Sequence, residues 1–208
     1  MNVLALGAHH DDIELGCAGA LIRHWRAGDL VLAVVMTAGN DVGASETRDA
    51  EARAAAEVMG MGVQGIEFWG QPDGSLNCGG CLIARLDSFC QEYRIDRLYA
   101  PPLSETDQDH RALGRIALAV CRYGQELLQY EGPSSYCFEP NVFIDLRDGL
   151  LERKLEALAC HASQVNRRGA TDLIEFVKAA AAMRGQQARR YRLAEAFAAY
   201  RLHLYIGD

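Results

Sequence analysis

The chain opens with Asn2-Val3-Leu4-Ala5-Leu6-Gly7-Ala8-His9-His10-Asp11-Asp12-Ile13-Glu14. Residues 2–7 are apolar and short, as expected for a buried parallel strand, and residues 15–25 have the pattern of a helix. The polar cluster thus follows the carboxyl end of a strand, where open α/β sheets place their active sites. Imidazole and carboxylate are the ligands that zinc prefers after thiolate. Crowding these groups into one turn is costly unless a cation neutralises them, so the turn predicts a metal site.

Strand and helix signals alternate through the first two-thirds of the chain. Further strands are expected at 30–37, 65–69, 97–100 and 141–146. Further helices are expected at 47–59, 82–93, 109–123, 150–160 and 173–190. Repeated βα units predict an α/β fold with a Rossmann-like, mainly parallel twisted sheet and helices on both faces. Because no Gly/Ser linker or internal repeat interrupts residues 1–208, we expect a single domain.

Charge and composition exclude several functional classes. The net charge of −7 argues against a nucleic-acid-binding protein, which needs basic stripes to meet phosphates. No apolar run is long enough to predict a membrane span. The seven cysteines are odd in number and scattered, and residue 2 already begins a strand without a preceding signal peptide. We therefore expect a cytoplasmic protein with reduced thiols.

A second polar cluster follows the expected strand at 97–100 and spans residues 104–111. Two loops at the same sheet edge can meet in space, which would bring together His9, Asp12 and His110. Three protein ligands with an open position for water are typical of catalytic zinc, whereas structural sites have four. Asp11 would then be free to accept a proton from that water. Two histidines and one carboxylate also suit Fe²⁺ or another divalent ion.

These motifs resemble those of a known family. Ala8-His9-His10-Asp11-Asp12-Ile13-Glu14 is similar to an A-H-P-D-D-E signature, and Asp109-His110-Arg111 is similar to D-H-R. Weaker matches lie in order along the chain: Arg48-Asp49-Ala50-Glu51-Ala52, Gln71-Pro72-Asp73-Gly74, His161-Ala162-Ser163-Gln164 and Ala194-Glu195-Ala196-Phe197. The chain resembles the PIG-L/LmbE-type zinc-dependent N-deacetylases over nearly its whole length.

The resemblance implies an enzyme that hydrolyses N-acyl, typically N-acetyl, groups on amino-sugar-containing small molecules or glycoconjugates. Asp11 would be the general base, and Arg48 and Asp73 would match residues that hold the sugar. A homo-oligomer is expected. The zinc ligands implied by the resemblance are His9, Asp12 and His110.

Two positions depart from the family pattern. His10 replaces a proline, so the turn loses a fixed φ; we interpret His10 as a hydrogen-bonding neighbour and not as a ligand. Asp107 stands where the family often has a histidine that assists the oxyanion or the leaving amine. A carboxylate there would act as the general acid only with a pKa raised by burial. Otherwise Tyr136 or His161 would supply the acid.

Three alternatives stay open. The first is an amidase that cleaves a larger conjugate, such as a thiol-sugar adduct. The second is a non-catalytic metal-binding or regulatory domain, which the Asp107 departure favours. The third, nucleotide binding, is weakly supported because the turn after residue 7 lacks the glycines that let a backbone approach a pyrophosphate.

Overall fold

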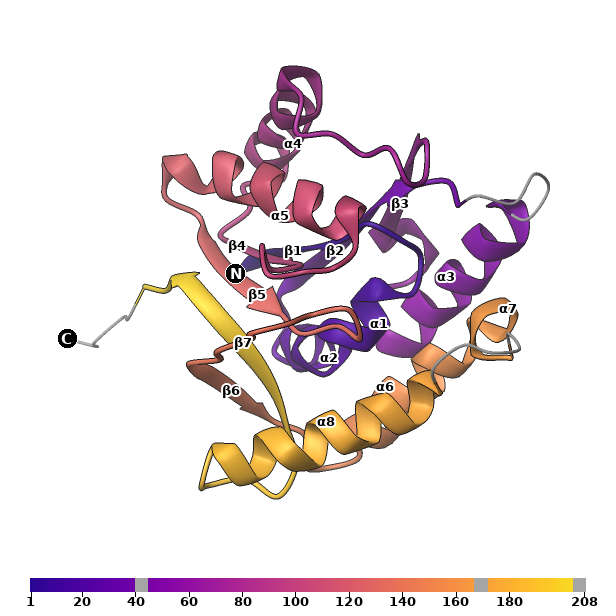
Figure 1. Cartoon of the computed structure of the whole chain (residues 1–208), viewed down its shortest axis with the longest axis vertical. Coiled ribbons are helices and arrows are strands. Elements are labelled where there is room, and N and C mark those ends of the chain that lie inside the picture. The colour runs from indigo at the N-terminus through magenta and orange to yellow at the C-terminus, as the bar shows by residue number, and fades with distance from the viewer. Residues whose placement is uncertain (40–44, 167–171, 204–208) are drawn as a thin grey trace.

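A computed structural model describes residues 1–39, 45–166 and 172–203 (Figure 1). Its centre is one seven-stranded sheet with the order β3-β2-β1-β4-β5-β7-β6. The strands are β1 (Asn2–Gly7), β2 (Leu30–Thr37), β3 (Ile66–Gln71), β4 (Arg97–Ala100), β5 (Glu126–Tyr130), β6 (Val142–Asp145) and β7 (Ala194–Arg201). Strands β1 to β5 pair in parallel, and β7 runs antiparallel to both β5 and β6. The prediction of a mainly parallel α/β sheet is confirmed.

Helices cover both faces of this sheet (Figure 1), with α4 and α5 on one side and α1, α2, α3, α6 and α8 on the other. The helices are α1 (Asp12–Gly16), α2 (Ala18–Arg26), α3 (Ser45–Met59), α4 (Gly80–Glu92), α5 (Gln108–Val120), α6 (Leu150–Ala159), α7 (Ala162–Val165) and α8 (Leu173–Gln187). Two short 3-10 turns, η1 (Val63–Gly65) and η2 (Cys121–Tyr123), follow α3 and α5. Within the described residues, no helix combines the length and the apolar character that crossing a bilayer requires.

The central strand β1 supplies side chains to both hydrophobic cores. Val3 and Ala5 belong to the cluster under α2, α3, α6 and α8, whereas Leu4 and Leu6 belong to the cluster under α4 and α5. Alternation of side chains along a strand produces this division. A strand that is covered on both faces must be apolar throughout, which is why residues 2–7 signal a parallel sheet so clearly.

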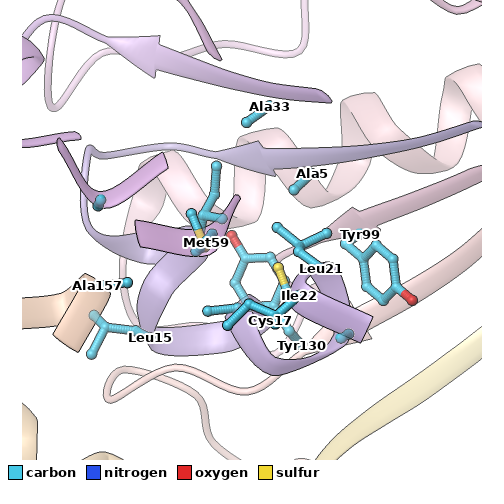
Figure 2. Close-up of a cluster of buried hydrophobic side chains, with 14 of the residues drawn as sticks. Ala5, Leu15, Cys17, Leu21, Ile22, Ala33, Met59, Tyr99, Tyr130 and Ala157 are labelled. Atoms are coloured by element: carbon cyan, nitrogen blue, oxygen red, sulfur yellow. The ribbon is translucent and has the colours of Figure 1, made fainter. Parts of the chain in front are cut away.

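Close packing fixes α1 against the sheet. A Cβ on Gly16 would lie 2.1 Å from the ring of Tyr130, so only glycine fits there. The Tyr130 hydroxyl donates a hydrogen bond of 2.7 Å to the carbonyl of Leu6. Figure 2 shows Tyr130 within this core, close to Leu21 and Ile22 of α2. The helix that follows the polar turn of β1 therefore rests on a rigid aromatic side chain.

The structure differs from the sequence-based expectations in three places. The helix expected at 15–25 is divided at Cys17, whose φ of −140° and ψ of 11° end α1 before α2 begins. Strands β5 and β7 were not predicted; in β7, four of the eight residues are Ala, which favours helices in isolation. Several bounds shift by a few residues, as in β3, which continues to Gln71.

A buried carboxylate joins β7 to α2. Glu195 accepts hydrogen bonds from the backbone N–H groups of Gly19 and Ala20 at 2.8 and 2.7 Å. Lys154 of α6 donates to the same carboxylate at 2.7 Å, and both side chains are almost completely buried. The pair links the last strand, the first long helix and α6.

We predict that Lys154→Met destabilises the protein by about 3–5 kcal/mol, because Glu195 would remain as a buried charge without a counterion. Urea denaturation followed by circular dichroism measures the change. The matched control is Lys178→Met, which removes an exposed lysine paired with Glu175 and should leave the midpoint unchanged. Equal midpoints for Lys154→Met and the wild type would contradict this account.

Candidate metal centre

The turn after β1 has a tightly determined backbone. A Cβ on Gly7 would lie 2.8 Å from the carbonyl oxygen of His9, so the chain can turn this sharply only with glycine. The backbone N–H and the hydroxyl of Thr37 both donate to the carbonyl of Ala8, at 3.0 and 2.8 Å. The backbone N–H of His9 donates to Asp12 Oδ2 at 2.7 Å. These contacts fix the directions of His9 and Asp12.

The second loop, between β4 and α5, is fixed by two aspartates. Asp107 is the N-cap of α5, and its Oδ1 accepts from the backbone N–H groups of Asp109 and His110 at 2.8 and 3.1 Å. Asp109 accepts from the backbone N–H groups of Gly74 and Leu76 at 2.7 and 3.0 Å. The loops that follow β1, β3 and β4 therefore converge on one point at the edge of the sheet.

His9, Asp12 and His110 meet there. His110 Nε2 lies 3.2 Å from His9 Nδ1 and 3.1 Å from Asp12 Oδ1, and His9 Nδ1 lies 3.7 Å from Asp12 Oδ2. Ligands about 2.0–2.1 Å from a tetrahedral zinc ion are separated by roughly 3.3 Å from one another. The donor set and its spacing thus fit a divalent metal, and the three residues that the sequence predicted as ligands form a group able to hold one.

Electrostatic coupling in this group is strong. Burial disfavours a charged His110, but the Asp12 carboxylate overcomes this and raises the pKa of His110 to about 11 in the metal-free protein. Burial also opposes ionisation of Asp12, yet His110 and His9 lower the pKa of Asp12 well below its ordinary value. The carboxylate is therefore ionised, and His110 holds a proton until a metal replaces it.

Carboxylates also contact the second ring nitrogen of each histidine, His9 Nε2 and His110 Nδ1, which does not face Asp12. Asp73 Oδ1 lies 3.2 Å from His9 Nε2, and Asp109 Oδ2 lies 3.6 Å from the same nitrogen. Glu105 Oε2 lies 3.2 Å from His110 Nδ1. Asp73 was predicted to hold substrate, and the structure places it beside His9, one of the three predicted metal ligands. Glu105 was given no role from the sequence; its place in the second polar cluster was the only available signal.

Asp11 and Arg48 lie together beside the ligands. Asp11 is the N-cap residue of α1 but makes no side-chain capping hydrogen bond, so its carboxylate is available for other contacts. Arg48 Nη2, from the first part of α3, lies 3.7 Å from Asp11 Oδ1. The structure therefore pairs the predicted base, which directly precedes Asp12 in the chain, with one predicted substrate-binding residue.

His10 points away from the ligands and into the protein. Its Nε2 lies 2.8 Å from Asp49 Oδ1, and its ring stacks on Phe68 with centroids 5.5 Å apart. Burial lowers the pKa of His10, although the hydrogen bond with Asp49 opposes this. His10 thus packs as a neutral ring that joins the turn to α3, which agrees with its interpretation as a hydrogen-bonding neighbour.

Glu14 and His161 form a buried pair behind the turn. Glu14 Oε2 lies 3.2 Å from His161 Nε2, and both side chains are almost completely buried. His161 precedes α7 instead of lying within a helix as expected. Tyr136, the other alternative acid, is half-exposed on the loop that follows β5. The burial of His161 makes it a support of α1 and not a group open to solvent.

Comparison with known proteins identifies the family. The model described as PIG-L: GlcNAc-PI de-N-acetylase matches residues 4–121. The chain belongs to the PIG-L family. The protein named "Uncharacterized deacetylase YaiS" from Escherichia coli (strain K12) is 32% identical over 168 residues, which cover 78% of this chain and 91% of that protein. The resemblance seen in the sequence motifs is confirmed.

Two solved structures share the fold. The N,N'-diacetylchitobiose deacetylase of Pyrococcus horikoshii superposes with a TM-score of 0.79 and 22% identity, covering 95% of this chain and 83% of that one. GalB, the 4-carboxy-2-hydroxymuconate hydratase of Pseudomonas putida KT2440, superposes with a TM-score of 0.83 and 20% identity, covering 100% and 99%. Because a deacetylase and a hydratase share this fold, the activity must be argued from the site.

Metal binding should release about one proton per ion at pH 7, because His110 is protonated in the metal-free protein and must bind as the neutral ring. The apparent affinity for Zn²⁺ should rise with pH for the same reason. Isothermal titration calorimetry in buffers of different ionisation enthalpy measures the released protons. A binding enthalpy that does not depend on the buffer would contradict the assignment of that proton.

Proposed function

We propose that the protein is a metal-dependent hydrolase that removes an N-acetyl group from an amino-sugar-containing small molecule. The observation that carries this proposal is the convergence of His9, Asp12 and His110, with Asp11, whose carboxylate makes no capping hydrogen bond, directly before Asp12 in the chain. Membership of the PIG-L family supports deacetylation as the reaction. The names of a relative and of a solved structure with this fold are those of deacetylases.

Zinc is the metal we propose. Two imidazoles and one carboxylate, with a fourth position left for water or substrate, form a catalytic zinc site, and Fe²⁺ would fit the same ligands. When bound, such an ion lowers the pKa of a coordinated water and polarises an acyl oxygen. His9 and His110 would bind through the ring nitrogens that face Asp12, Nδ1 and Nε2 respectively.

Asp11 is the proposed general base. It accepts a proton from the water that attacks the acyl carbon and then passes that proton to the leaving amine. Arg48, 3.7 Å from Asp11, keeps this carboxylate oriented and donates to hydroxyl or phosphate oxygens of the substrate. Asp73, at the rim beside His9, accepts from sugar hydroxyls. These roles follow the family motifs at the same positions.

Asp107 is the proposed partner of Asp11 in proton transfer. Its Oδ1 accepts two backbone hydrogen bonds, whereas no partner is assigned to Oδ2 among the described residues. One of its carboxylate oxygens lies within 4.8 Å of a ring nitrogen of His9, so the side chain borders the reaction centre. Oδ2 is therefore the atom that would accept a hydrogen bond from the leaving amine. This assignment gives a physical role to the residue that replaces the expected histidine.

A non-catalytic metal-binding domain is the second candidate, and the specific observation in its favour is Asp107. A carboxylate that stays ionised would repel the developing oxyanion instead of stabilising it. An amidase acting on a larger conjugate remains a variant of the first proposal, because the same groups would hydrolyse either amide. The size of the released acid distinguishes these two hydrolases.

We predict that the zinc-loaded protein releases acetate from at least one N-acetylated amino sugar, sugar nucleotide or sugar-bearing conjugate. Dialysis against a chelator should abolish release, and added Zn²⁺ should restore it, because the attacking water depends on the metal. An acetate assay with mass analysis of the amine product measures this. Stoichiometric Zn²⁺ without turnover on such a panel would favour the non-catalytic alternative.

Asp11→Asn should lower kcat by about 10²–10⁴-fold, because an amide cannot accept the proton of water. Bound Zn²⁺ should stay stoichiometric, since Asp11 is not a ligand. The matched control is Asp172→Asn, which changes the N-cap of α8 and preserves its capping ability. Full activity in the Asp11 variant would overturn the assignment of the base.

A further inference from the structure

We propose that Glu105 is a positioning residue that holds His110 in the tautomer and orientation required for metal binding. The inference rests on the proposed metal site but not on the reaction carried out there. Glu105 lies three positions before Gln108, the first residue of α5, and is only 1% exposed. A residue so deeply buried does not meet the substrate, so its role is exerted through its neighbours.

The contacts of Glu105 are all with hydrogen-bond donors. Oε2 lies 3.2 Å from His110 Nδ1 and also accepts from the hydroxyl of Ser134, while Oε1 accepts from the hydroxyl of Ser135. Ser134 Oγ itself lies 3.3 Å from His110 Nδ1. Three donors around one carboxylate stabilise its charge at a site where an unpaired charge would be costly.

This environment selects one tautomer of His110. A carboxylate accepts hydrogen bonds and donates none, so the ring nitrogen that faces Glu105 carries the hydrogen. Nε2, which faces His9 and Asp12, also holds a hydrogen in the metal-free protein, and this is the hydrogen that a metal would displace, so the ring would bind through Nε2 with its remaining hydrogen on Nδ1. Metal-binding histidines commonly donate their other N–H to a carboxylate, which fixes the ring and raises its basicity as a ligand.

The backbone around Glu105 holds the carboxylate in place. Glu105 and Ser135 form an isolated antiparallel bridge, flanked by hydrogen bonds of 3.0 Å from Thr106 N to Ser134 O and from Tyr136 N to Ser104 O. Arg111 Nη1 donates to the carbonyl of Glu105 at 2.6 Å. The loop that follows β5 therefore supports Glu105 in the loop after β4, and Glu105 in turn contacts His110 in the first turn of α5.

Asp73 provides an informative contrast. It contacts His9 Nε2 at the same distance of 3.2 Å, but its side chain is 12% exposed at the rim of the site. Asp73 can therefore meet a substrate as well as a histidine, whereas Glu105 meets only His110 and the two serines. Substitution of Glu105 should change metal binding without changing groups that contact the substrate.

The test is Glu105→Gln, which keeps the shape of the side chain and removes its charge. We expect Zn²⁺ affinity, measured by competition with a chelating dye, to fall about 10–100-fold while the thermal midpoint of the metal-free protein shows that it folds. NMR of the zinc-loaded wild type should show a His110 Nδ1–H that exchanges slowly with water because Glu105 accepts its hydrogen bond, and the variant should show faster exchange. The matched control is Glu131→Gln on the same loop, where Glu131 pairs with Arg184; its affinity should equal that of the wild type.

A folded Glu105→Gln protein with wild-type Zn²⁺ affinity and unchanged exchange of the His110 Nδ1–H would overturn the proposal. If that variant does not fold, Ser135→Ala removes one donor from the carboxylate, and a loss of Zn²⁺ affinity smaller than tenfold but above that of the control is expected. Unchanged affinity in Ser135→Ala would then count as the refutation. Because these measurements need no substrate, they remain decisive even if no N-acetyl sugar is hydrolysed.

Discussion

Asp12 and His110 meet at 3.1 Å, and this contact joins the loops that follow two neighbouring parallel strands, β1 and β4. The contact depends on the pairing of β1 with β4 and on the turn after β1. Parallel pairing brings the carboxyl ends of both strands to one edge, and the tight turn after Gly7 aims His9 and Asp12 across the gap. Without a metal the contact is an ion pair in which His110 keeps its proton.

Strand β5 and the loop after it supply none of the three predicted ligands, yet they contact the groups around them. Tyr130 of β5 packs against α1, and the serines after β5 donate hydrogen bonds to Glu105 next to His110. The Glu14–His161 pair adds a buried contact between α1 and the chain segment before α7. A solved structure named as a hydratase shares this fold, so the fold alone does not decide the reaction.

Sequence patterns predicted four of the five parallel strands and the three residues that converge, because both depend on local signals. Residues 2–7 and 30–37 are apolar strands, and each predicted ligand lies just after a strand or in the first turn of a helix. The patterns predicted neither β5 nor β7, and the Ala-rich sequence of β7 becomes a strand through pairing with β5 and β6. Nor could they assign Glu105, because its serine partners are distant in the chain and only the folded loops bring them together.

Glu195 of the last strand caps α2, and this determines when that contact can form during synthesis of the chain. Gly19 and Ala20 are made early, whereas the carboxylate that binds their N–H groups lies on the final strand. During synthesis on the ribosome, the chain emerges from its N-terminus, so the turn that carries His9 and Asp12 is made long before Glu195. The two N–H groups of α2 that Glu195 binds therefore wait for their acceptor until the last strand has emerged.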